Sequence, residues 1–142
     1  MRKIWSLAVL MMMSSFVFAQ SGDDILGTWL TEGGKSKVEV TKNDGKYFGK
    51  IIWLKDPMRD GKPKVDKNNE EESLRSRPVI GVPLLKGFEW DDDIYEDGTI
   101  YDPENGKTYS CEITFDGNDK LNVRGYIGFS LLGRTTYWTR VK

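Results

Sequence analysis

The sequence contains no histidine, and Cys111 is its only cysteine. The chain therefore cannot form a Ser-His-Asp triad, a Cys-His nucleophile, a histidine-ligated zinc site or an internal disulfide. An enzyme built from it would depend on Asp, Glu, Tyr, Lys or Arg alone. We therefore expect no catalytic residue, no metal and no cofactor.

The chain also lacks an excess of positive charge. It carries 21 Lys and Arg residues against 22 Asp and Glu residues, a net charge of -1. Two of the basic residues, Arg2 and Lys3, fall in a predicted leader, and without them the balance is 19 against 22, or -3. Nucleic-acid-binding surfaces are rich in basic residues, so nucleic acid is not an expected partner.

The only long hydrophobic run lies near the N-terminus. Two basic residues precede an apolar stretch over residues 4–18, which ends in the small-residue pattern of a signal peptidase site. We predict a cleaved signal peptide over residues 1–19, with an uncleaved anchor as the alternative. The run is too short for a comfortable transmembrane span. These features predict export to the periplasm or beyond, where Cys111 should be buried or bonded to a second chain.

Residues 20–142 are predicted to form a single all-β domain. Apolar and polar residues alternate from Lys107 to Phe115 and again from Lys120 to Ile127, the period of a half-buried strand. The remaining chain has room for about eight strands at the usual spacing. An antiparallel sheet of that size closes on itself rather than leave two edges bare. We therefore expect a small up-and-down β-barrel, with a β-sandwich as the competing architecture.

Two segments depart from simple alternation. Residues 47–54 are apolar on both faces, so we expect the following segment to cover one of them. The two faces are Tyr47, Gly49, Ile51 and Trp53, and Phe48, Ile52 and Leu54. Residues 55–78 show no strand pattern and are predicted to be an insertion. It should contain a short helix capped by Asn69, with Glu70, Glu71 and Glu72 in its first turn, that Pro78 stops.

Both ends of the predicted domain carry residues of a known motif. Gly27-Thr28-Trp29 opens the first predicted strand, and Arg140 lies near the end of the last. This pairing resembles the calycin superfamily of lipocalins, fatty-acid-binding proteins and avidins. The resemblance implies that Gly27, Trp29 and Arg140 close one end of the barrel, with the guanidinium lying across the indole.

From Ile25 to Val141 the chain also resembles a bacterial family of unknown function, DUF2147. The segments that carry this resemblance are 27–29, 47–51, 74–78 with 80–81, 98–103, 106–109, 123–128 and 132–135. The resemblance implies an exported, calycin-like barrel and no particular reaction. One departure is Asn68-Asn69-Glu70, which stands where the family often has Asn-Pro-Asp.

Seven residues make up the predicted ligand-binding set: Trp53, Trp90, Tyr101, Arg75, Arg77, Arg124 and Tyr126. The large aromatic residues, together with Trp138, can line a narrow barrel or fill it. The arginines suit a carboxylate or phosphate, although Arg75 and Arg77 can equally pair with acidic residues of the insertion. The turn at 128–133 exposes apolar residues that can contact a membrane or partner, or fold over the barrel mouth.

These observations favour an exported, lipocalin-like barrel that binds a small, partly apolar ligand. The alternative is an envelope barrel that interacts with proteins or has a structural role, with a filled core and no small ligand. An acidic cluster over residues 91–97 can suggest Ca²⁺ binding or glycoside hydrolysis. A solvated turn explains the cluster equally well.

Overall fold

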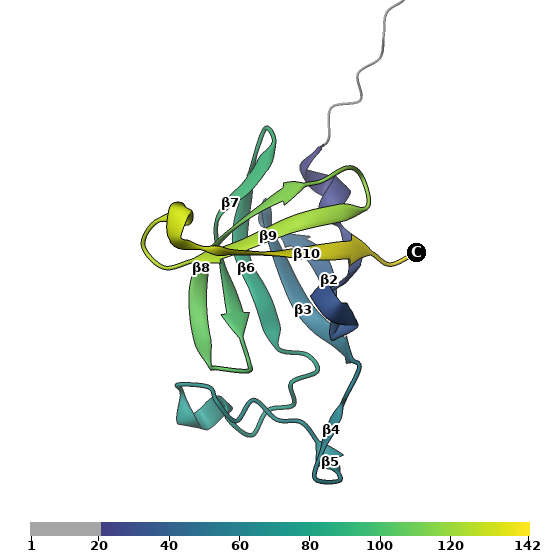
Figure 1. Ribbon diagram of the computed structural model, residues 1–142, viewed down its shortest axis with the longest axis vertical. Helices are drawn as coiled ribbons and strands as arrows, with labels where there is room; N and C mark the ends of the chain where they lie inside the picture. The colour runs from purple at the N-terminus through teal and green to yellow at the C-terminus, as the bar shows by residue number, and fades with distance from the viewer. Residues whose placement is uncertain (1–20) are drawn as a thin grey trace, which may run out of the picture.

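A computed structural model describes residues 21–142, so the predicted signal peptide lies outside the described residues. Eight antiparallel strands pair in a closed ring, in the order β1-β10-β9-β8-β7-β6-β3-β2 (Figure 1). They are β1 (Gly27–Leu30), β2 (Ser36–Asn43), β3 (Lys46–Leu54), β6 (Pro83–Asp91), β7 (Ile94–Asp102), β8 (Lys107–Phe115), β9 (Lys120–Tyr126) and β10 (Arg134–Arg140). Because the last strand pairs with the first, the predicted barrel is confirmed and the sandwich is excluded.

The connections alternate between two ends of the barrel. The closed end carries the 3-10 helix η1 (Gly22–Ile25) and the turns β2–β3, β6–β7 and β8–β9. The open end carries the 3-10 helix η2 (Glu32–Gly34), the segment 55–82, the β7–β8 turn and the β9–β10 loop with the 3-10 helix η4 (Ser130–Leu132). A short hairpin of β4 (Met58–Arg59) and β5 (Lys62–Pro63) extends from the segment 55–82.

Inward-facing residues of the strands form the core. The alternation predicted for β8 and β9 is confirmed, since Cys111, Ile113, Leu121 and Val123 are all buried. It ends with β9 at Tyr126, and the prediction that Ile127 also faces the core was wrong, because Ile127 lies in the following loop and is exposed. Burial raises the pKa of the Cys111 thiol to about 12, so this cysteine is a neutral core residue. No second cysteine exists to bridge it.

The closed end is sealed by Trp29, whose side chain is fully buried. Its indole N–H donates to the Ile25 carbonyl at 2.8 Å, which fixes η1 beneath the barrel. The Arg140 guanidinium carbon lies 4.4 Å from the Trp29 ring centroid, and the same side chain donates to the Asp24 carbonyl at 2.7 Å. Gly27 adopts a φ of 125°, a conformation that favours glycine.

Aromatic side chains fill the space above η1. Tyr95 is fully buried between Trp90, at a centroid distance of 4.5 Å, and Tyr47, at 5.3 Å. Its hydroxyl donates to the Gly22 carbonyl at 2.6 Å. Packing here is tight: a Cβ atom added at Gly98 would lie 2.5 Å from the Phe88 ring.

A β-bulge changes which residues of β3 face inward. Val38 pairs with Ile51 and Lys37 pairs with Trp53, so no residue of β2 lies opposite Ile52. The bulge places Trp53 on the outer wall, where Lys37 lies 4.8 Å over its ring, and lets Leu54 pack against the core. Ile52 and Trp53 stay 37% and 39% exposed, so the expectation that the following segment covers the second face of this strand was wrong.

The insertion lies across the open end rather than along the wall (Figure 1). Its helix is one 3-10 turn, η3 (Glu72–Leu74), and the longer helix capped by Asn69 was a wrong prediction. The Asn69 side-chain oxygen does accept a local bond from Glu71 N–H at 2.8 Å, but its amide donates to Asp66 and Tyr101, outside that turn. The local side-chain bond at Asn69 therefore forms without starting the predicted helix.

Candidate functional site

A cavity of about 910 Å³ opens at the open end of the barrel. Its inner wall is apolar and comes from five strands around the ring. The wall residues include Ile51, Leu84, Ile100, Val123 and Trp138. Trp138 is only 3% exposed and belongs to the hydrophobic core, so it forms the boundary between the core and the cavity. Ligand pockets in proteins commonly span about 300–1,000 Å³, so this cavity can accommodate a small molecule.

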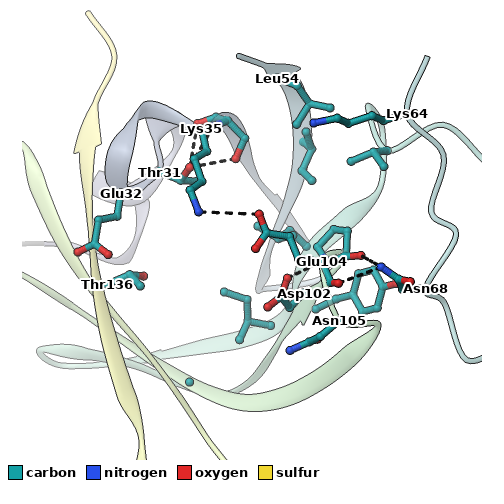
Figure 2. A pocket seen from close by; sticks show the side chains of 18 of the residues that line it. Thr31, Glu32, Lys35, Leu54, Lys64, Asn68, Asp102, Glu104, Asn105 and Thr136 are labelled. Carbon is teal, nitrogen blue, oxygen red and sulfur yellow. Dashed lines mark hydrogen bonds and ion pairs between the residues drawn. The ribbon is translucent and has the colours of Figure 1, made fainter. Parts of the chain in front are cut away.

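Charged side chains surround the mouth of this cavity. The basic ones are Lys35, Arg59, Lys64, Lys67 and Arg134, and the acidic ones are Glu32, Asp56, Asp102 and Glu104. Figure 2 shows Lys35 reaching from η2 toward Glu104 on the β7–β8 turn, with 3.8 Å between their charged atoms. Both side chains are exposed, so this ion pair is weak and can open without a large energetic penalty. The mouth is polar and of mixed sign above an apolar wall.

The insertion is fixed beside the mouth by a buried carboxylate. Asp66 has no exposed surface, and its two oxygens accept hydrogen bonds from three side chains. The donors are the Tyr101 hydroxyl at 2.6 Å, the Asn69 amide at 2.9 Å and the Arg77 Nε and Nη2 at 3.0 Å. A buried charge is tolerated only when it is paired and hydrogen-bonded in this way.

Tyr101 connects this network to the barrel because it belongs to β7. Burial, followed by the hydrogen bond to Asp66, raises the pKa of Tyr101 to about 12, so its hydroxyl stays a donor at neutral pH. Backbone hydrogen bonds also close the insertion on itself. Asp66 N–H donates to the Arg77 carbonyl, and Val79 N–H donates to the Lys64 carbonyl, at 2.9 and 3.0 Å.

A second contact joins the insertion to the β7–β8 turn. The Asn68 amide donates to the carbonyls of Pro103 at 3.3 Å and Glu104 at 2.9 Å, as Figure 2 shows. The two backbones approach so closely that a Cβ at Gly106 would lie 1.8 Å from the Asn68 carbonyl oxygen. Gly106 is therefore required at this position, and one side of the mouth has a fixed wall.

The structure brings only one member of the predicted ligand-binding set to the cavity. Tyr101 lines it, whereas Trp53 lies on the outer wall and Trp90 belongs to the aromatic cluster of the closed end. Arg77 is occupied by Asp66. Arg75 donates to the Asn69 and Glu70 carbonyls within the insertion. The structure thus places both arginines in internal contacts of the insertion.

Arg124 and Tyr126 lie on β9 but do not line the cavity. The Arg124 guanidinium donates to the Ser130 carbonyl at 2.7 Å and to the Thr135 hydroxyl at 2.9 Å, so it organises the β9–β10 loop. Tyr126 pairs with Ser110 at the end of β9 and stays partly exposed.

Sequence reasoning missed most of the cavity-lining residues. Val123 and Gly125 belong to the apolar face that alternation assigns to β9, so this pattern could have identified them. Leu54 could not be identified in this way, because the bulge at Ile52 reverses the faces. The mouth residues Lys35, Lys64 and Glu104 lie in loops, where no periodic pattern indicates which way a side chain points.

The DUF2147 family, described as "Uncharacterized protein conserved in bacteria", matches residues 27–140, which contain every barrel strand. The chain belongs to this family. The DUF2147 chain is also similar to a solved structure, protein HP1028 from the human pathogen Helicobacter pylori, which is described as a member of the lipocalin family. The two share 28% sequence identity over 82% of each chain, with a TM-score of 0.73. No curated protein matches this chain.

The family and the fold agree on a lipocalin-like barrel of unknown function. Among residues 21–142, no helix is long and apolar enough to span a membrane. Within the same residues, no group of three acidic or cysteine side chains is arranged to hold a metal ion.

Proposed function

We propose that this DUF2147 protein is an exported binding protein that holds one small, partly apolar molecule in the open end of its barrel. The observation that carries the proposal is the cavity of about 910 Å³, with Leu84, Val123 and Trp138 in its wall. Apolar surface of this kind favours an apolar ligand by roughly 25 cal/mol for each Å² removed from water.

The charged mouth supports an amphipathic ligand. A polar end of the ligand would lie among Lys35, Arg59 and Arg134 on one side and Asp102 and Glu104 on the other. Opening the exposed Lys35–Glu104 ion pair would admit the ligand at little energetic cost. The interaction-only alternative requires a filled core, and a cavity with an apolar inner wall above Trp138 argues against it.

Native mass spectrometry of protein purified from its own cell envelope tests the proposal. We expect an additional mass that denaturation removes. We also expect one or more members of a panel of fatty acids, sterols and isoprenoids to bind and to change tryptophan fluorescence, because Trp138 lines the cavity. Bare polypeptide together with no response to the panel would contradict the proposal.

A variant that fills the cavity connects binding to this site. A Cβ at Gly125 would make ordinary contacts with Ile100 and Tyr109, at 3.4 and 3.6 Å, so Gly125→Leu should fold and extend into the cavity. We expect it to weaken binding by roughly tenfold or more, since it displaces apolar contacts of about 1–3 kcal/mol. Ser110→Leu adds the same side chain at an exposed position of β8 and should leave affinity unchanged.

A further inference from the structure

The β9–β10 loop carries the most exposed apolar side chains of the described structure. In residues 127–133, here named the apolar loop, exposed fractions are 70% for Ile127, 75% for Phe129, 89% for Leu131 and 76% for Leu132. No other large apolar side chain in residues 21–142 exceeds 50%. In Figure 1 this loop, drawn in yellow, stands away from the barrel wall. It does not fold over the mouth.

The polar groups of the apolar loop are bonded from the barrel side. Arg124 donates through Nε to the Ser130 carbonyl at 2.7 Å and through Nη2 to the Leu131 carbonyl at 3.3 Å. The Ser130 hydroxyl donates to the Glu112 carboxylate at 2.6 Å. A charged guanidinium and a hydroxyl thus hold the loop from within, while its apolar side chains face outward.

Backbone hydrogen bonds within the loop complete this arrangement. Phe129 N–H donates to the Ile127 carbonyl, Leu132 N–H to the Phe129 carbonyl and Gly133 N–H to the Ser130 carbonyl, at 3.0–3.2 Å. The carbonyls of residues 127, 129, 130 and 131 therefore all accept internal bonds. Internal bonding of these four carbonyls lowers the cost of moving the loop from water into an apolar medium.

The size and charge of the apolar loop favour a lipid surface over a protein partner. A stable protein interface buries about 800 Å² on each side, more than four side chains of one protruding loop can supply. Residues 127–135 contain no acidic residue, and Arg134 at the end of the loop is exposed. Apolar side chains next to a cation suit the boundary between lipid headgroups and acyl chains.

We propose that the apolar loop inserts into the interfacial region of a lipid bilayer. Gly125 and Arg134, which bracket the loop, both line the cavity, so insertion brings the cavity mouth to the membrane surface. The proposal rests on the loop itself and not on the identity of any ligand in the cavity.

Vesicle flotation of residues 21–142 tests this proposal, because this segment contains all strands and the whole core of the closed barrel. We expect the protein to float with phosphatidylcholine vesicles, and more strongly when phosphatidylglycerol is added, because of Arg134. The triple variant Phe129→Ser, Leu131→Ser, Leu132→Ser should bind on the order of 100-fold more weakly.

A matched control removes apolar surface elsewhere. The double variant Ile52→Ser, Trp53→Ser changes exposed residues on the outer wall of β3 and should float like the unmodified protein. Insertion is measured directly with Leu131→Cys carrying an environment-sensitive fluorophore. Because Cys111 is only 1% exposed, the reagent modifies the new thiol selectively. We expect a blue shift on adding vesicles and quenching by brominated lipid.

Three outcomes would overturn the proposal. They are an absence of flotation with both vesicle types, equal flotation of the triple variant, and a dimer in solution that the triple variant abolishes. The last would assign the apolar loop to a second copy of the chain. Ligand binding in the cavity is read out separately by Gly125→Leu, so each proposal can fail without the other.

Discussion

The two ends of this barrel are stabilised by different kinds of interaction. At the closed end, Trp29 and Tyr95 are fully buried, and an added Cβ at Gly98 would overlap the Phe88 ring. At the open end, an added Cβ at Gly125 would make only ordinary contacts. One sheet thus contains a tightly packed half and a half that opens into a cavity.

The comparison shows which interactions stabilise the open end, where side chains do not fill the cavity. The open end is stabilised by hydrogen bonds and one buried ion pair, centred on Asp66 and Arg77, that attach the insertion to β7. Such contacts fix a loop without filling the space beside it. The closed end gains stability from apolar burial, and the open end uses polar contacts to keep a cavity.

The largest effect is expected from breaking the polar attachment. Arg77→Ala leaves the fully buried Asp66 carboxylate without its cation, which should destabilise the attached insertion by about 3–5 kcal/mol. We expect the amides of Asp66 and Val79 to exchange faster with solvent deuterium, while amides of the closed end keep their protection.

Arg75→Ala is the matched control, because its guanidinium donates only to backbone carbonyls of the insertion. This substitution should destabilise the attached insertion by only about 1 kcal/mol. Equal loss of protection at both ends in Arg77→Ala would mean that the barrel and the insertion unfold as one unit.

A smaller change in the free energy of unfolding should distinguish the tightly packed half from the half that carries the cavity. Gly98→Ala forces a methyl group into the Phe88 ring and should lower the free energy of unfolding by about 1–3 kcal/mol. Gly125→Ala should change it by less than about 0.5 kcal/mol. Urea denaturation of both variants measures the difference, and similar values would mean that the two halves are packed alike.

The smallest change in the free energy of unfolding is expected from removing the Arg140 cation at the closed end. Arg140→Ala removes the contact with the buried Trp29 ring and should lower the free energy of unfolding by about 1–2 kcal/mol. Lys120→Ala is the control, because its ammonium lies over the exposed Tyr137 ring and should contribute less than about 0.5 kcal/mol. An unchanged unfolding midpoint for Arg140→Ala would show that the contact does not stabilise the seal.

The closed end was largely predictable from sequence, and the open end was not. Alternation in β8 and β9 indicates strands, and Gly27, Trp29 and Arg140 match a motif whose three positions meet in the structure. These signals are local or lie at the two ends of the domain. By contrast, the cavity depends on loops that carry no periodic pattern.

Three particular residues show why the cavity escaped prediction. Trp53 follows the inward alternation of β3, but the bulge at Ile52 turns it outward. Asn69 carries a helix-capping signal and accepts from Glu71 N–H, yet its amide donates to Asp66 and only one 3-10 turn follows. Arg77 suits an anionic ligand, and the structure provides an internal anion instead. In each case a contact with another segment or loop residue decides between two locally reasonable outcomes.

Both ends of the described chain lie at the sealed base. Val141 N–H donates to the Thr28 carbonyl at 2.9 Å, the Lys142 ammonium lies 2.9 Å from Asp119 in the β8–β9 turn, and η1 starts one residue after Ser21. A tether, tag or fused domain attached at either end would therefore leave the opposite face unobstructed. Immobilised on a sensor chip through either end, the molecule would point its entrance and its apolar loop toward the solution.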